Sequence, residues 1–198
     1  YCDAYETSTA STSMGVPVVL KYAPTGNSEN YPSRGTLQQT YDQILADLEE
    51  AEKFVTRKGV SQSSSITTDV ITAFKARVAL GMKDYDTARI AAEAVIATKK
   101  YTLVSNATTY AEGWINDNLS ETIFQLAMIN STEVGNAYSY FLYNSSGIEG
   151  RDNPQYIPED WVLDLYDKNK DIRYAAYFDE RTVTTPVVGK MTLLIKYP

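Results

Sequence analysis

The sequence predicts a mostly helical protein built from tetratricopeptide-like helical hairpins, with long loops and a few short strands. Two patterns support this prediction. Residues 69–82 and 86–99 are apolar helical segments joined by a tight turn, and residues 36–56 carry apolar side chains at spacings of three and four. Because a single helical hairpin cannot bury both of its faces, the hairpin needs neighbouring helices in the same protein.

The two helices of the hairpin differ in character. The first, residues 69–82, is apolar around most of its circumference, as expected for a helix that is buried on more than one side. The second, residues 86–99, has one small apolar face and one charged face. The apolar face consists of Ala88, Ala91, Ala92, Val95 and Ile96, and the charged face of Asp86, Arg89, Glu93 and Lys100. Because alanines let two backbones approach closely, we expect the apolar face to pack against the first helix while the charged face meets water.

Capping residues mark where the helices begin. The hydroxyl groups of Ser33 and Thr36 precede the long helix, and Thr67 or Thr68 can cap the first helix of the hairpin. Asp69 then lies near the positive N-terminal end of that helix, where a carboxylate is favourable.

The remaining segments are assigned from composition and periodicity. Residues 1–35 form a loop, with a short strand or buried extended run at 16–20; residues 121–128 and 138–143 form strands; residues 159–167 form a helix after a proline; and residues 187–197 form extended segments. In the helix at 159–167, Trp161, Val162 and Leu165 are expected to face inward.

Composition restricts the classes of function. The 198 residues are 43% hydrophobic and 22% charged, which is typical of a soluble globular protein, and no apolar run approaches the roughly 20 residues that cross a bilayer. A net charge of −7 argues against nucleic acid as a partner, because nucleic-acid-binding proteins gather Lys and Arg on one face. With no His and a single Cys, the sequence lacks the commonest general base and an internal disulfide. We therefore expect no metal, no cofactor and no catalytic site.

A series of short motifs runs along the chain from about residue 15 onward. The motifs are PSRGT at 32–36, YDQI at 41–44, DLEEA at 47–51, AFKARVAL at 73–80, DYDTA at 84–88, SETIF at 120–124 and DIR at 171–173. In this order they strongly resemble the SusD/RagB family of nutrient-binding outer-membrane lipoproteins of Bacteroidetes. No single motif is decisive, but their common order makes chance similarity improbable.

The resemblance implies a helical tetratricopeptide-like scaffold, with loops and short strands that build a ligand site. Family members are more than twice as long as this chain, so we expect an internal part of one SusD-like domain. Its scaffold would lie at 36–100 and its loop- and strand-rich ligand-binding part at 101–198. The resemblance also implies a surface-exposed lipoprotein of the outer membrane, held only by a lipid anchor that this chain lacks. Cys2 is not expected to carry that lipid, because no signal segment precedes it.

The resemblance further implies a function. A non-catalytic receptor of this family captures an oligosaccharide or polysaccharide and delivers it to a partner, a TonB-dependent (SusC-like) outer-membrane transporter, in nutrient uptake and polysaccharide utilization. The composition agrees with carbohydrate binding, because 16 Tyr accompany only 5 Phe and 2 Trp. An aromatic ring stacks on the apolar face of a sugar, and a phenol group can bind the hydroxyl groups around it.

The candidate ligand-binding residues are aromatic side chains in loops rather than on helical stripes. They are Trp114, Tyr138, Tyr140, Tyr143 and Tyr156. Gly113 permits a turn that would expose Trp114. A Tyr in a Ser- and Asn-rich segment can equally be partly buried or solvated, so each assignment competes with a structural role. By contrast, Tyr41, Tyr85 and Trp161 are expected to be structural.

Two other functions remain open at this stage. A tetratricopeptide-like hairpin also suits a peptide-binding or protein-docking module. A glycoside hydrolase would need two carboxylates across a cleft, such as Glu159 with Asp160 or Glu121 with Asp117, and nothing in the sequence places either pair in that way.

One acidic segment has the spacing of a calcium loop. Asp167, Asn169 and Asp171 match the first ligand positions of an EF-hand, but the Gly and the bidentate Glu that the loop needs are absent. We instead expect Asp171 and Arg173 to form a local charge pair that fixes the turn after the preceding helix.

Overall fold

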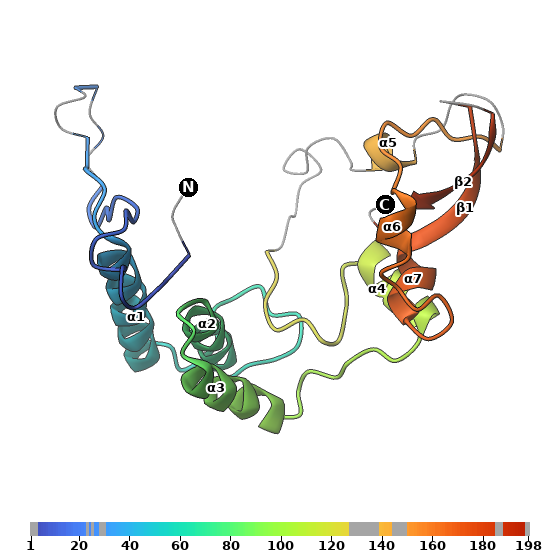
Figure 1. The fold of residues 1–198 in the computed structure, drawn as a ribbon. Coiled ribbons are helices and arrows are strands. Elements are labelled where there is room, and N and C mark those ends of the chain that lie inside the picture. The colour runs from blue at the N-terminus through green and yellow to red at the C-terminus, as the bar shows by residue number, and fades with distance from the viewer. Residues whose placement is uncertain are drawn as a thin grey trace. The chain divides into compact units, whose positions relative to one another are not determined.

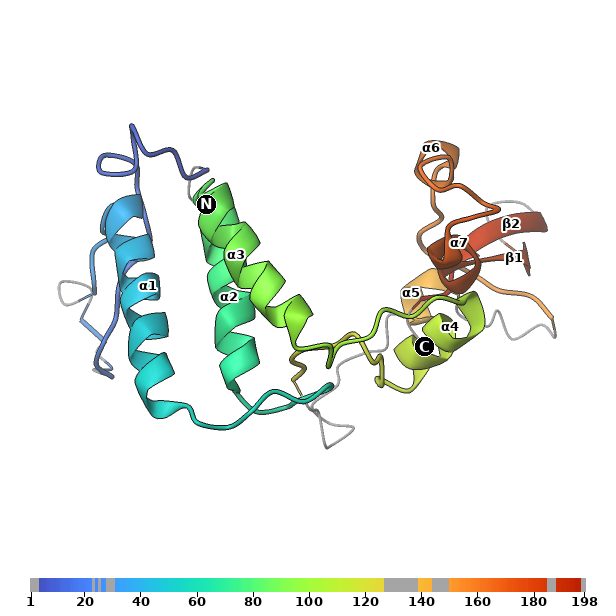
Figure 2. The same cartoon turned by 90° about the horizontal axis from the view of Figure 1, so that it is seen from below.

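A computed structural model describes residues 4–22, 24, 26–27, 31–126, 139–143, 150–184 and 188–196. The chain divides into two compact units, residues 1–101 and 102–198. The described residues form mainly helices and one two-stranded sheet (Figures 1 and 2), so the predicted mostly helical fold class is confirmed.

The first unit begins with an N-terminal segment that packs against the long helix α1 (Leu37–Phe54). Thr36 caps this helix as predicted. Its hydroxyl accepts a hydrogen bond from the amide of Gln39, and the Gln39 side chain accepts one from the amide of Thr36, which together form a capping box. Leu37 and Tyr41 at the start of α1 pack against a small core that includes Tyr5.

The predicted hairpin consists of α2 (Thr68–Gly81) and α3 (Tyr85–Ala97), capped by Thr67 and Asp84. Its helices begin and end within two residues of the predicted bounds. Helix α2 lies between α1 and α3 (Figure 2) and buries Val70 and Ile71, while α3 buries Ala88 and Val95. The close packing of a small-residue face against α2 is therefore confirmed for these positions.

Other side chains of the hairpin differ from the prediction. Phe74 and Leu80 of α2 and Ile96 of α3 are exposed, so the apolar surface extends beyond what the unit itself covers. Tyr85 is also exposed, at 64%, and the expectation that it is structural is wrong; Tyr41, by contrast, packs edge-on against Tyr5.

Asp69 joins the two ends of the hairpin. Its carboxylate accepts hydrogen bonds from Lys100 at 2.9 Å, from Tyr101 at 3.0 Å and from Thr68 at 3.2 Å. Burial by itself raises the pKa of the Asp69 carboxyl, but these hydrogen bonds outweigh burial and lower that pKa below its ordinary value. Burial and the hydrogen bond to Asp69 raise the pKa of Tyr101 to about 12. Lys100, expected on the water-facing side, is thus a structural partner of α2.

The second unit combines short helices with a sheet. The helices are α4 (Ala107–Ile115), α5 (Ser139–Leu142), α6 (Asp160–Leu163) and α7 (Ile172–Tyr177), and the antiparallel strands are β1 (Phe178–Val183) and β2 (Gly189–Leu194). Helix α7 runs directly into β1 and packs on α4 around Tyr110, Leu119 and Ala176. The fully buried Val183 and Leu193 hold the sheet against the rest of the unit.

Several predictions for the second unit are wrong. Residues 121–126 form no strand, while the last two residues of the strand predicted at 121–128 lie outside the described part of the chain. Residues 139–142 form α5 rather than a strand. The helix predicted at 159–167 is reduced to the single turn α6, in which Leu163 is buried and Trp161 is 67% exposed; Leu165 lies beyond α6 and is 72% exposed.

The predictions for the two ends of the chain are partly confirmed. Strand β2 confirms the extended segment at 187–197 for its described residues, whereas α4, α7 and β1 were not predicted. Residues 16–20 have no regular secondary structure and are exposed, so they form neither a strand nor a buried run. In the described part of the chain, no helix combines the length and the apolar character needed to span a bilayer.

Candidate functional site: an aromatic pocket in the second unit

A pocket of about 430 Å³ lies within the second unit. Its described walls come from α5, the segment before α6, the junction of α7 with β1, and the end of β2. We call it the aromatic pocket. It is lined by three tyrosines, a phenylalanine, aliphatic side chains and one lysine, namely Tyr156, Tyr166, Tyr177, Phe178, Leu142, Ile157, Pro158, Val162, Leu194 and Lys196.

The floor of the aromatic pocket is positioned by the start of α7. The Asp171 side chain caps this helix by accepting the amide hydrogen of Arg173, and it forms an ion pair with the Arg173 guanidinium at 2.6 Å. The predicted pair of Asp171 and Arg173 is therefore confirmed, although it opens a helix. The Arg173 guanidinium lies 5.5 Å from the centre of the Tyr166 ring, and this ring packs edge-on against Phe178.

Tyr177 connects the pocket to the aromatic residues behind it. Its hydroxyl lies 2.8 Å from that of Tyr110 in α4, a hydrogen bond between residues that are far apart in the sequence. Burial, together with this hydrogen bond, raises the pKa of the Tyr177 phenol well above its ordinary value. The phenol therefore stays neutral and keeps its donor and acceptor character at neutral pH.

Lys196 also lies between the pocket and the aromatic residues behind it. Its ammonium group is 3.8 Å from the centre of the Trp114 ring and 4.8 Å from that of Tyr177. The Trp114 ring in turn packs edge-on against both Tyr110 and Tyr177. The cation is thus held by two rings while it lines the pocket.

Tyr156 is the accessible aromatic ring of the pocket. It is 66% exposed and lies 6.4 Å from Phe141, measured between ring centres. The backbone amides of Gln155 and Tyr156 both donate hydrogen bonds to the carbonyl oxygen of Phe141, at 2.9 and 3.2 Å. These hydrogen bonds hold the backbone of the Tyr156 loop against α5, while the ring of Tyr156 stays exposed.

The predicted ligand-binding residues are only partly brought together. Tyr156 lines the pocket, and Trp114 lies behind it, half-buried in α4. The expected turn at Gly113 is wrong, because this glycine is a buried helical residue against which the Leu119 side chain packs without room for a Cβ. Tyr143 lies apart from the described pocket lining, under the guanidinium of Arg181 at 5.0 Å.

The environment of Tyr143 is that of a packed residue. Burial raises the pKa of its phenol, and the charge of Asp152 acts in the same direction against that of Arg181. Tyr138 lies outside the described residues, as does the side chain of Tyr140, whose backbone belongs to α5. These two remain predictions.

Sequence reasoning missed Tyr166, Tyr177, Phe178 and Lys196. A local signal existed: four aromatic residues fall between 166 and 178, a density that favours a shared cluster. Among the described lining residues there is no carboxylate, and neither pair considered for glycoside hydrolysis contributes to the pocket. The described residues also hold no cluster of acidic or thiol ligands suited to a metal ion. The arrangement is suited to binding.

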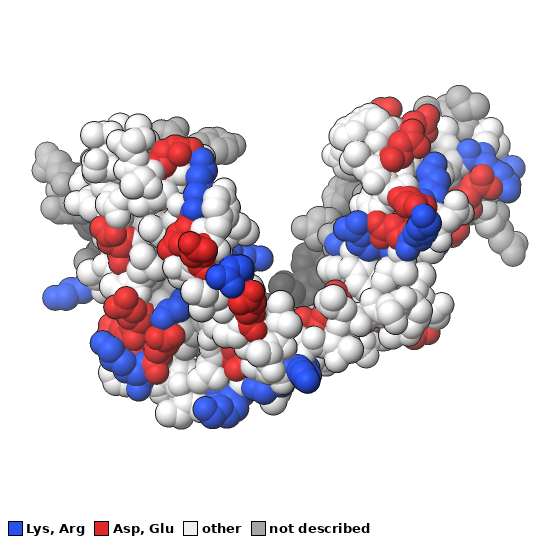
Figure 3. Space-filling view, turned by 60° about the horizontal axis from the view of Figure 1, so that its bottom comes forward, with Lys and Arg blue, Asp and Glu red and all other residues white. Residues whose placement is uncertain are grey.

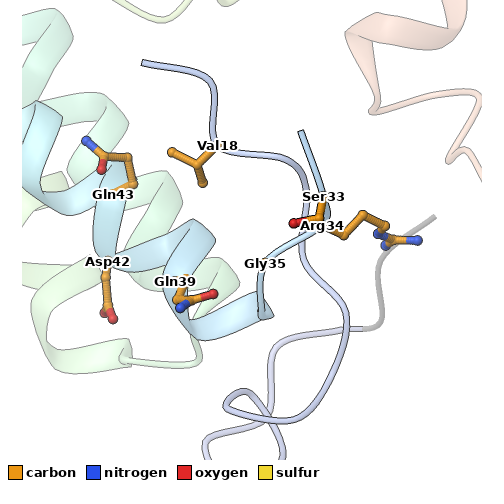
Figure 4. Close-up of a pocket in the computed structure, with 7 residues that line it drawn as sticks. All are labelled: Val18, Ser33, Arg34, Gly35, Gln39, Asp42 and Gln43. Atoms are coloured by element: carbon orange, nitrogen blue, oxygen red, sulfur yellow. The ribbon is translucent and has the colours of Figure 1, made fainter. Parts of the chain in front are cut away.

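A second pocket, of about 590 Å³, lies in the first unit at the start of α1 (Figure 4). Its described lining is mainly polar and contains no aromatic ring, comprising Val18, Ser33, Arg34, Gly35, Gln39, Asp42 and Gln43. Arg34 donates a hydrogen bond to the carbonyl of Gly15 at 2.7 Å, and its side chain points away from α1 in Figure 4. The described lining of this pocket therefore offers no aromatic ring on which a sugar could stack.

Comparisons with known proteins find one curated relative that matches about half of the chain, and solved structures that match more of it. No family model matches it. A curated SusD-like protein from Formosa agariphila is 30% identical over 106 residues, which cover 54% of this chain and 21% of that protein. The chain therefore spans about a fifth of the length of this relative.

Solved structures show the same fold. A SusD superfamily protein from Bacteroides thetaiotaomicron matches 96% of this chain and 42% of its own with a TM-score of 0.69 at 24% identity. A second, from Bacteroides vulgatus, matches 99% and 42% with a TM-score of 0.65 at 21% identity. A SusD-like carbohydrate binding protein from Bacteroides vulgatus matches 91% and 37% with a TM-score of 0.61 at 18% identity.

Proposed function

We propose that this chain, which belongs to the SusD-like family, is part of a non-catalytic cell-surface receptor for glycans. The chain spans less than half the length of the family members compared with it. The receptor captures an oligosaccharide in the aromatic pocket and passes it to a TonB-dependent outer-membrane transporter. In this proposal residues 36–100 are scaffold and residues 101–198 carry the ligand-binding part.

The observation that carries the proposal is the exposed ring of Tyr156 above an apolar, aromatic wall. A pyranose ring presents C–H groups on one face and hydroxyl groups at its rim. The face stacks on Tyr156, whose loop is held by two hydrogen bonds to Phe141, so little order has to be gained on binding. The aliphatic side chains of Pro158 and Val162 exclude water beside the sugar.

The phenol groups of the pocket supply the polar half of recognition. The hydroxyl groups of Tyr166 and Tyr177 can both donate and accept hydrogen bonds, which matches the donor and acceptor character of sugar hydroxyls. A pocket with stacking rings and few polar groups gives modest affinity and fast release, which transfer to a transporter requires. The transporter and the outer-membrane location rest on the family resemblance, and the name of the Bacteroides vulgatus relative supports carbohydrate as the ligand.

A glycan array probed with the purified protein tests this function, with a set of peptides printed on the same array. We expect binding to one or a few oligosaccharides and none to the peptides. An assay for released reducing ends on the bound glycans should stay at background, because the described pocket lining has no carboxylate. Binding confined to peptides would favour a tetratricopeptide-like docking module, and release of reducing ends would establish a hydrolase.

A further inference from the structure

Most of the described lining of the aromatic pocket is apolar. We propose that this apolar part binds a methyl group of the sugar, so that the receptor prefers a 6-deoxyhexose or an O-acetylated unit. This inference rests on the proposed glycan-binding function and adds the chemical class of the ligand. The apolar part consists of six of the ten described lining side chains, namely Leu142 of α5, Ile157 and Pro158 before α6, Val162 of α6, Phe178 of β1 and Leu194 of β2.

The fold places two of these side chains next to each other. Phe178 and Leu194 are partners in the register of β1 with β2, so their side chains lie on the same face of the sheet. The Phe178 ring is buried, and its centre lies 5.3 Å from that of Tyr166 and 5.4 Å from that of Tyr174. The apolar surface is therefore held in place by its neighbours, which limits the order that has to be gained on binding.

The other four described lining side chains are polar, three tyrosines and Lys196, and two of these already have partners. The hydroxyl of Tyr177 lies 2.8 Å from that of Tyr110, and the ammonium group of Lys196 lies against the rings of Trp114 and Tyr177. A sugar unit that brings all of its hydroxyl groups against this lining meets few side chains that can bind them. A buried hydroxyl group without a hydrogen-bond partner costs free energy.

A methyl group in place of a hydroxyl group avoids that cost. A hexose carries a hydroxymethyl group at C5, whereas a 6-deoxyhexose carries a methyl group there, and an O-acetyl group covers a hydroxyl oxygen and ends in a methyl group. Burial of this methyl group against aliphatic side chains such as Val162 and Leu194 is favourable. Both kinds of sugar thus present the same chemistry to the apolar part of the pocket.

Long-range charge gives no comparable basis for selection. The net charge of the chain is −7, which disfavours anionic glycans at a distance. On the face drawn in Figure 3, the described acidic and basic side chains are interspersed rather than gathered by sign. Selection among glycans is therefore expected to come from contacts inside the pocket.

The test uses pairs of glycans that differ at one substituent: 6-deoxyhexose oligosaccharides beside their 6-hydroxy counterparts, and O-acetylated oligosaccharides beside their deacetylated forms. In calorimetric titrations, the protein should bind the methyl-bearing member of at least one pair roughly tenfold or more tightly. The pair that shows the preference identifies the source of the methyl group. Val162→Thr, which replaces one methyl group of the lining by a hydroxyl group, should lower this preference roughly threefold or more.

Val188→Thr is the matched control. It makes the same exchange in the same unit, at a valine that is 58% exposed and is not among the described lining residues, and it should leave the preference unchanged. Thermal unfolding checks that both variants are folded. If the hydroxylated members bind as tightly as the methyl-bearing ones, or if folded Val162→Thr keeps the full preference, the methyl assignment is wrong while the glycan-binding function stands. If no glycan of any pair binds, the proposed function itself fails.

Discussion

The ammonium group of Lys196 lies 3.8 Å from the centre of the Trp114 ring, and this contact joins the segment just after β2 to α4. Tyr177 of α7 packs on the same tryptophan, so three elements of the second unit meet at one side chain. Trp114 therefore supports the wall of the aromatic pocket from behind, whereas sequence reasoning had assigned it to the ligand.

The two tryptophans should differ sharply in their contribution to stability. Trp114→Ala should lower the free energy of unfolding by about 3 kcal/mol, because it removes a packed ring from the cluster with Tyr110 and Tyr177. Trp161→Ala removes a ring that is 67% exposed and should cost no more than about 0.5 kcal/mol. Urea denaturation of the two variants measures both values. A larger loss for Trp161→Ala would mean that α6 packs differently.

Asp69 should stabilise the hairpin at neutral pH but not in acid. Asp69→Asn removes the charge that accepts hydrogen bonds from Lys100 and Tyr101, and should cost about 2 kcal/mol at pH 7. Because the folded state lowers the pKa of this carboxyl from 3.8, its contribution is complete above that value and is lost as the pH falls through the lower, folded-state pKa.

Chemical denaturation at a series of pH values measures this effect as the difference between parent and variant. Glu93→Gln is the control, since it breaks an exposed pair with Arg89 and should change stability by less than about 0.5 kcal/mol. A difference for Asp69→Asn that stays constant down to the lowest pH would contradict a stabilising carboxylate.

A glycine beside Asp69 makes the same cluster possible. A Cβ on Gly59 would collide with the Asp69 carboxylate, so Gly59→Ala should destabilise by roughly 1 to 3 kcal/mol. A Cβ on Gly26 would meet nothing within 4 Å, so Gly26→Ala should be neutral. Differential scanning calorimetry of the two variants compares them directly, and equal melting temperatures would show that the loop at 59 relaxes away from Asp69.

The helices of the first unit could be predicted because their signals are local. Periodic apolar residues and the capping hydroxyls of Thr36 and Thr67 lie within or next to the helices they define. The exposure of Ile96 and the pairing of Lys100 with Asp69 could not be predicted. Both depend on how the end of α3 lies against the start of α2, which is a tertiary contact and not a local signal.

The second unit was harder to predict because its elements are short and depend on distant partners. Helix α6 has 4 residues and α7 has 6, too few for a periodic pattern to emerge. The contact of Tyr110 with Tyr177 spans 67 positions of the sequence. Tyr156 was found because aromatic loop residues were sought, whereas the other rings of the pocket come from segments that only the fold brings together.

The central claim, that Tyr156 is the stacking surface for a glycan, has a direct test. Isothermal titration calorimetry with the best glycan from the array should give at least tenfold weaker binding for Tyr156→Ala, a loss of about 1.4 kcal/mol. Tyr85→Ala is a matched control, because Tyr85 is 64% exposed against 66% for Tyr156 but lies in the first unit. Its affinity should stay within about twofold of the parent. Parent-like binding by Tyr156→Ala, with the protein folded, would contradict the account.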